Sequence, residues 1–170
     1  MTSRIIRQFS PAWAHRARHP FIYLGCPYTS PDTELQQTRV EVASIVAAEL
    51  AISNHAVFSP ITHGHSMAQH LPGGAASSTH QFWMGQCLPI LAAADELWVL
   101  PLEGWEQSRG LEEELVFAQD HGIPIKFLVR LREPWNRYLG EFEASAEAIK
   151  RWEQAEVVTL QAQTWPGVRP

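Results

Sequence analysis

The sequence predicts an α/β domain built on a doubly wound parallel sheet of four to five strands. Short apolar segments alternate with helical patterns in the order β-α-β-α-β-α-β, and most connections between them are short. Such alternation is typical of parallel sheets that carry helices on both faces and are joined by right-handed crossovers. The chain has 170 residues, which fits a single domain of this kind.

The predicted strands are short segments rich in aliphatic, β-branched and aromatic residues. The first of them is closed by Gly-Cys-Pro, as expected for a buried strand that ends in a turn. We expect strands at residues 21–25, 56–60, 96–100 and 123–129, with a fifth, edge strand at 157–160.

The predicted helices follow the strands. We expect them at residues 30–53, 79–94, 109–121 and 141–154. Ser30 and Pro31 provide a cap and a first-turn proline for the first helix. Gly85 and Pro89 predict that the second helix is kinked or divided, and Gly122 ends the third.

Three segments stand outside this pattern. Residues 61–78 are polar and contain glycine, and they are too long for a plain connection. We expect a lid, a binding loop or a subunit contact there. Residues 1–19 are predicted to be an N-terminal arm and residues 161–170 a loose tail, which leaves residues 20–160 as the domain.

Composition excludes several function classes. The net charge of −5 argues against a nucleic-acid-binding surface, which needs concentrated Lys and Arg. No apolar segment is long enough to cross a bilayer, and the first twenty residues lack the apolar core of a secretory signal. Two cysteines without C-x-x-C spacing agree with a reducing compartment. We therefore expect a cytoplasmic protein without a membrane partner.

Common cofactor and nucleotide motifs are absent from the sequence. It contains neither G-x-x-x-x-G-K-[ST] nor G-x-G-x-x-G, so triphosphate hydrolysis and dinucleotide redox chemistry are not expected. Cys26 lacks the downstream Arg that a phosphatase nucleophile needs. A metal site at His63 and His65 remains an alternative, but their spacing matches no template, and we expect no metal or other cofactor.

The loops after the predicted strands form the expected pocket wall, because ligands of such sheets lie beyond the carboxyl ends of the strands. From them we select as substrate-binding residues Cys26, Pro27, Tyr28, Ser59, His63, His65, Ser108 and Gly110. Ser108 and Gly110 open the third helix, where unpaired N–H groups and the helix dipole favour an anion.

Glu114 is the first candidate catalytic residue. At spacings of three and four it shares a helix face with Gly110, Leu111, Phe117 and Ala118, so we expect its carboxylate at the edge of the buried side. Buried carboxylates occur mostly at working sites, although Glu112 and Glu113 need no such explanation. Asp95 is either a turn residue or a second pocket acid.

Three elements of the sequence together resemble the nucleoside 2-deoxyribosyltransferase superfamily. They are Tyr23 in Phe-Ile-Tyr-Leu-Gly-Cys-Pro-Tyr, Asp95 before the third strand, and the pattern S-x-G-x-x-x-E-x-x-x-A from Ser108 to Ala118. The Cys-Pro-Tyr, Phe-Ser-Pro and Gly-Trp segments are most similar to its DUF1937-type branch. The resemblance covers residues 21–128.

The resemblance implies a flavodoxin-like fold and an enzyme that is an N-glycosidase (a hydrolase) or a 2-deoxyribosyltransferase of nucleotide metabolism. Glu114 would attack the sugar and form a glycosyl-enzyme, Asp95 would handle the proton of the base, and Tyr23 would position Glu114. Ser108 suggests a nucleotide rather than a free nucleoside. A homodimer or larger homo-oligomer is implied as well. Where this branch often has an acid, two turns before Asp95, the chain has Cys87.

Two alternatives stay open. The first alternative to the glycosidase or transferase is a module that binds or senses a nucleotide without cleaving it. The second, less favoured, is a metal-dependent hydrolase that uses His63 and His65.

Overall fold

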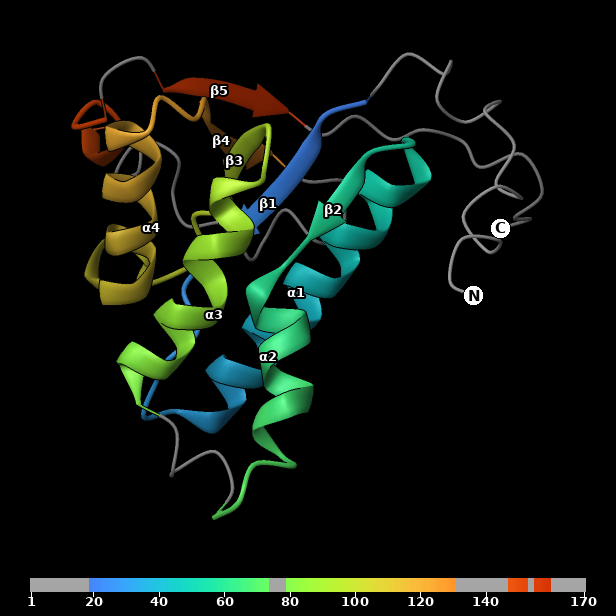
Figure 1. The fold of residues 1–170 in the computed structure, drawn as a ribbon, viewed down its shortest axis with the longest axis vertical. Coiled ribbons are helices and arrows are strands. Elements are labelled where there is room, and N and C mark those ends of the chain that lie inside the picture. The colour runs from blue at the N-terminus through green and yellow to red at the C-terminus, as the bar shows by residue number, and fades with distance from the viewer. Residues whose placement is uncertain (1–18, 74–78, 131–146, 153–154, 160–170) are drawn as a thin grey trace, which may run out of the picture.

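A computed structural model describes residues 19–73, 79–130, 147–152 and 155–159. They form a five-stranded sheet in the order β2-β1-β3-β4-β5, and every pairing is parallel (Figure 1). The strands are β1 Phe21–Gly25, β2 Ala56–Phe58, β3 Glu96–Val99, β4 Ile125–Arg130 and β5 Glu156–Thr159. This confirms the predicted parallel sheet and its edge strand, and the strand order is that of flavodoxin-like folds.

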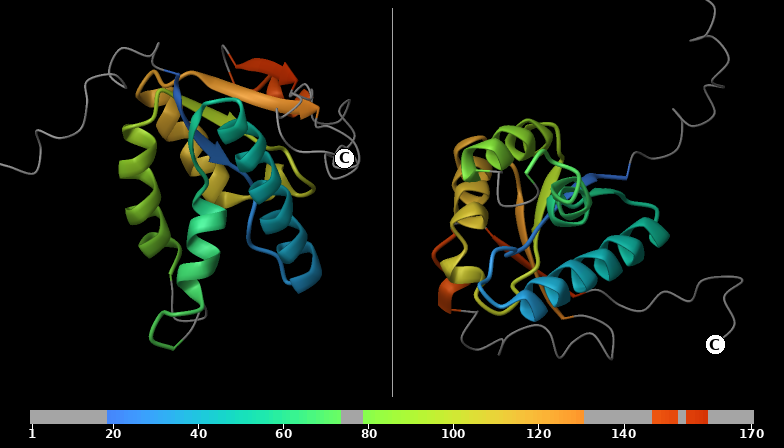
Figure 2. Two further views of the ribbon diagram at one scale, coloured as in Figure 1. Left: turned by 90° about the vertical axis from the view of Figure 1, so that its right-hand side faces the viewer. Right: turned by 90° about the horizontal axis from the view of Figure 1, so that it is seen from below.

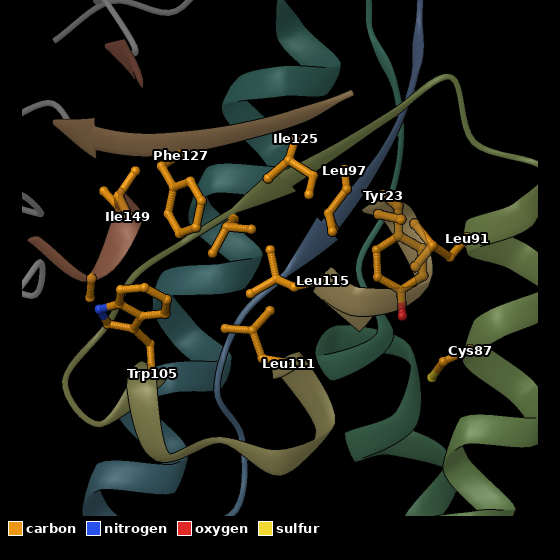
Figure 3. Close-up of a cluster of buried hydrophobic side chains, with 13 residues drawn as sticks. Tyr23, Cys87, Leu91, Leu97, Trp105, Leu111, Leu115, Ile125, Phe127 and Ile149 are labelled. Carbon is orange, nitrogen blue, oxygen red and sulfur yellow. The ribbon is translucent and has the colours of Figure 1, made fainter. Parts of the chain in front are cut away.

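Helices cover both faces of the sheet, as expected for a doubly wound fold (Figure 2). They are α1 Thr33–Ile52, α2 Pro60–Ala68, α3 His80–Ala92 and α4 Arg109–Asp120, and a 3₁₀ turn, η4 Trp105–Gln107, precedes α4. Alternate residues of β1 serve the two faces. Ile22 and Leu24 join the core under α1, whereas Tyr23 joins the core under α3 and α4 (Figure 3).

Helix α1 begins later than predicted. Its N-cap is Asp32, whose carboxylate accepts hydrogen bonds from the N–H groups of Glu34 and Leu35. Ser30 instead accepts a hydrogen bond from the Asp32 N–H. An aspartate that can serve two N–H groups is a stronger cap than a serine followed by proline, so the helix starts at Thr33.

The prediction of a long loop after β2 is wrong in its first half, because residues 60–68 form α2. Ser59 is the N-cap and Pro60 occupies the first turn, a start signal that stands in the sequence. The predicted division of the next helix is also not observed. α3 runs as one helix of 13 residues with Pro89 inside it.

Helix α4 starts where the sequence predicts. Ser108 caps it, and Gly122 follows its end with a φ of 66°, a conformation that favours glycine. The predicted arm at 1–19, the tail at 161–170 and most of the predicted helix at 141–154 lie outside the described residues. None of the helices in the described ranges is long and apolar enough to span a membrane.

Candidate active site

The site lies where β1 and β3 meet at the carboxyl end of the sheet. β1 pairs with β2 on one side and with β3 on the other. After β1 the chain continues to β2 at one edge of the sheet, and after β2 it crosses back to β3 on the other side of β1, so the direction of the strand order reverses here. Leu100 donates its N–H to the Gly25 carbonyl at 2.8 Å, which ties the two strand ends together. In open α/β sheets, such a switch point is where ligands bind.

Glu114 of α4 reaches this point and is held there by Tyr23 of β1. The phenol of Tyr23 donates to Glu114 Oε1 at 2.5 Å, and the two residues are 91 positions apart in the chain. The side chains are buried, with Glu114 only 4% exposed. The structure therefore brings together the predicted nucleophile and its predicted positioning residue.

Gly25 makes room for the other oxygen of this carboxylate. A Cβ atom built on Gly25 would lie 3.0 Å from Glu114 Oε2 and 3.0 Å from the Cδ1 of Leu111. Both neighbours are buried residues of α4. A glycine at the last position of β1 is thus what lets the carboxylate lie against the strand.

The surroundings change the acidity of both groups. Burial raises the pKa of Glu114 to about 7, although the hydrogen bond from Tyr23 favours the ionised form and works in the opposite direction. Burial also raises the pKa of Tyr23 well above its ordinary value, and the nearby Glu114 charge adds to this shift. The phenol consequently stays a hydrogen-bond donor while the carboxylate titrates near neutrality.

Two thiols lie close to this pair. Cys87 of α3 packs in the same core as Tyr23, below its hydroxyl (Figure 3). Burial and the Glu114 charge raise the pKa of Cys87 to about 11, and the same two causes raise the pKa of Cys26. Sequence reasoning did not select Cys87. Its signal was the spacing of two helical turns before Asp95, where the resembled branch has an acid.

Asp95 lies at the other end of the sheet. Its carboxylate accepts the N–H of Phe21 at 2.8 Å, and its own N–H donates to the Phe21 carbonyl. Phe21 begins β1 and Gly25 ends it, so these contacts are roughly 13 Å from the Glu114 carboxylate at about 3.3 Å per strand residue. The structure therefore does not bring Asp95 to the Tyr23–Glu114 pair.

The first turn of α4 carries the predicted anion contacts. The Ser108 hydroxyl accepts the Leu111 N–H at 3.4 Å as a cap. Gly110 faces α3, and a Cβ built there would meet Met84 and His80 at 3.7 and 3.9 Å, which is ordinary contact. Glu113 is 2.9 Å from His80 Nε2, and Arg109 also donates to it, so acidic and basic groups alternate around this helix end.

The remaining predicted contacts divide between the rim of the site and α2. Cys26, Pro27 and Tyr28 follow β1 directly, and the Tyr28 hydroxyl lies 2.9 Å from His65 Nδ1. Ser59 is occupied as the cap of α2. His63 packs against Phe58, which in turn packs against Tyr23. His63 also borders a hollow of about 550 Å³ with Thr62, Ser66, Met67, His70 and Leu71.

Within the described ranges, no group of three or more His, Cys, Asp or Glu side chains is placed to hold a metal ion. His65 is engaged by Tyr28 on one ring nitrogen and lies 3.4 Å from Gln69 on the other. The described residues therefore lend no geometry to the metal-dependent alternative.

Comparison with known families identifies the domain that contains these residues. A model of a domain of unknown function, DUF1937, matches residues 20–129, which span β1 to β4. The chain belongs to the DUF1937 family. A search of curated protein sequences returned no match. The matched part of this DUF1937 protein contains Tyr23, Gly25 and Glu114, so the whole observed constellation lies inside the family domain.

Proposed function

We propose that this DUF1937 domain cleaves or transfers the N-glycosidic bond of a nucleotide or nucleoside, with Glu114 as the nucleophile. One observation carries the proposal: a carboxylate that is 4% exposed accepts a hydrogen bond from a buried phenol at the switch point of the sheet. A buried acid in such a place is costly to the fold, and costly ionisable groups are concentrated at catalytic sites.

The chemistry follows from the acidity of Glu114. With a pKa of about 7, a substantial fraction of the carboxylate is ionised at neutral pH. The ionised oxygen attacks the anomeric carbon, the base departs with the electrons of the carbon–nitrogen bond, and water or a second base then releases the sugar. Tyr23 holds one carboxylate oxygen and leaves the other, beside Gly25, as the attacking atom.

The start of α4 supports a substrate that carries a phosphate. The positive end of its dipole favours an anion one turn before Glu114, although the Leu111 N–H is already bound by the Ser108 hydroxyl. Arg109, which is largely exposed, adds a cation beside Ser108 and Gly110. The resemblance to deoxyribosyltransferases further supports a homo-oligomer, which light scattering of the purified protein would test.

The test is release of a free base from a panel of nucleosides and nucleoside monophosphates, followed by chromatography. We expect turnover by the wild-type protein, none by Glu114→Ala, and full turnover by Glu112→Ala. Glu112 is the matched control because it lies in the same helix but is exposed. A 2-fluoro-sugar analogue should add its mass to the peptide that contains Glu114.

Equal activity of the two alanine variants would contradict the role of Glu114. Recovery of an intact ligand that nevertheless raises the melting temperature would favour a binding module instead.

A further inference from the structure

Arg39 of α1 is the second charged residue that the fold buries, and it has no role in the chemistry described above. Its side chain is 4% exposed and lies at the carboxyl end of the sheet, on the face opposite Glu114. Burial of a guanidinium is costly unless its donors are satisfied, so its partners indicate what it is for.

The partners of Arg39 are backbone carbonyls of two different loops. Nη1 donates to the carbonyls of Tyr28 at 3.2 Å and Thr29 at 2.9 Å, in the loop after β1. Nη2 donates to the carbonyl of Glu103 at 2.5 Å, in the loop after β3. One planar group therefore bridges the loop that follows β1 and the loop that follows β3.

Gly104 shows that this bridge is closely fitted. Its φ of 79° favours glycine, and a Cβ built on it would lie 2.7 Å from Arg39 Nη2. None of the ion pairs in the described part of the chain includes Arg39, although the nearby Glu103 charge favours its charged form and partly offsets the lowering of its pKa by burial. Its Nε has no hydrogen-bond partner among the described residues. The contacts are thus directed at loop carbonyls rather than at a counter-ion.

We propose that Arg39 is a positioning residue of the site, which fixes the separation of the two rim loops and so the substrate contacts that they carry. This inference rests on the proposed function for its effect on turnover. The first loop contains Cys26, Pro27 and Tyr28, and the second leads through η4 to Ser108 and Gly110. Loops that are held in place before binding lose less conformational entropy when substrate arrives.

Arg39 should act on binding rather than on the chemical step. Tyr23 and Gly25 lie on β1 and Glu114 lies on α4, so their positions are set by a strand and a helix. Among the described residues, none of the three is hydrogen-bonded to Arg39. Loss of the bridge therefore weakens ground-state and transition-state binding alike, which raises KM and leaves kcat in place.

The test compares Arg39→Lys with Val46→Ala. Lysine keeps the charge and has three N–H donors, but they share one nitrogen, so it cannot place donors at the Nη1 and Nη2 positions of the planar guanidinium at once. Val46 is the control because it is a buried residue of the same helix, 1% exposed, whose truncation lowers stability and removes no hydrogen bond to either loop.

For Arg39→Lys we expect KM at least tenfold higher, kcat within threefold, and faster amide exchange in both loops, residues 26–32 and 100–108. Val46→Ala should lower the melting temperature with KM and loop exchange unchanged. The exchange measurement needs no substrate, so it decides the bridging role even if the panel reveals no turnover. Unchanged exchange in either loop, or a KM that also rises in Val46→Ala, would overturn the proposal.

Discussion

Glu114 and Asp95 are both acids that accept one short hydrogen bond from β1, yet their surroundings differ completely. Glu114 is buried at the carboxyl end of the sheet and is met by a side-chain phenol. Asp95 lies at the amino end and accepts a backbone N–H, in an exposed setting. The first arrangement raises a pKa and needs a glycine beside it, whereas the second ties one strand to the start of the next. Hydrogen bonding alone therefore does not distinguish the proposed nucleophile from Asp95; burial and the end of the sheet at which each residue lies do.

Amide substitution of each acid gives the widest separation. Glu114→Gln keeps the shape and should lower kcat on the order of a thousandfold, because the amide is not a nucleophile. The kcat of Asp95→Asn should stay within about threefold of the wild-type value, since its amide oxygen can still accept the Phe21 N–H. Steady-state kinetics on any substrate of the panel measures both. Comparable losses would mean that the amino end of the sheet takes part in catalysis.

The pH dependence of stability tests the burial of Glu114 next. The folded pKa of Glu114 lies above its ordinary value of 4.5, at about 7, so the folded state binds more protons than the unfolded state between these values. Stability should therefore fall as pH rises from 4.5 to 7, by roughly 3 kcal/mol, and level off above. Denaturant unfolding at several pH values should show this slope in the difference between the unfolding free energies of the wild type and of Glu114→Gln.

Adding a side chain at Gly25 tests the packing around Glu114. The added methyl group of Gly25→Ala meets Glu114 Oε2 at 3.0 Å, so we expect a loss of about 2 kcal/mol in unfolding free energy and a large fall in kcat. Gly85→Ala is the matched change, because nothing lies within 4 Å of its added atom. That variant should gain up to about 1 kcal/mol from helix propensity. If Gly25→Ala were as harmless as Gly85→Ala, the close approach of the carboxylate would be refuted.

Removal of the phenol hydroxyl should have the smallest effect. Tyr23→Phe deletes the donor that favours ionised Glu114, so the pKa of Glu114 should rise further. Turnover at pH 7 should fall about tenfold and recover in part at higher pH. A pH–rate profile of both proteins tests this, and an unshifted midpoint would separate the phenol from the titration of the carboxylate.

Helix periodicity and the family resemblance together predicted the part of the site that lies on a regular strand and a regular helix, namely Tyr23 and Glu114. The helix phase placed Glu114 on the buried face of α4, and Tyr23 was the only strand phenol available to it. The resemblance implies that Asp95 handles the proton of the base, whereas the structure places it at the start of β1, away from Glu114. A residue that precedes a parallel strand lies at the amino end of the sheet, whereas ligands bind at the other end.

Other features depend on contacts between distant segments and could not be read from local patterns. Cys87 reaches Tyr23 only because α3 packs over β1, and Arg39 finds its acceptors in loops that no periodicity positions. Helix α2 was missed for a different reason. Its histidines and glycine suggested a loop, although Ser59 and Pro60 already marked a helix start.

The missing side chain at Gly25, which lets Glu114 approach β1, also defines a segment of three residues that could be recognised in other sequences. Because side chains alternate along a strand, Tyr23 and Gly25 face the same helix, and the segment Tyr-x-Gly supplies a proton donor and an empty space side by side. Neither half is informative alone, since phenols and glycines are common in strands. A first strand that ends in Tyr-x-Gly, together with a later helix that places an acid on its buried face, is therefore a rule for finding this arrangement from sequence where overall similarity has disappeared.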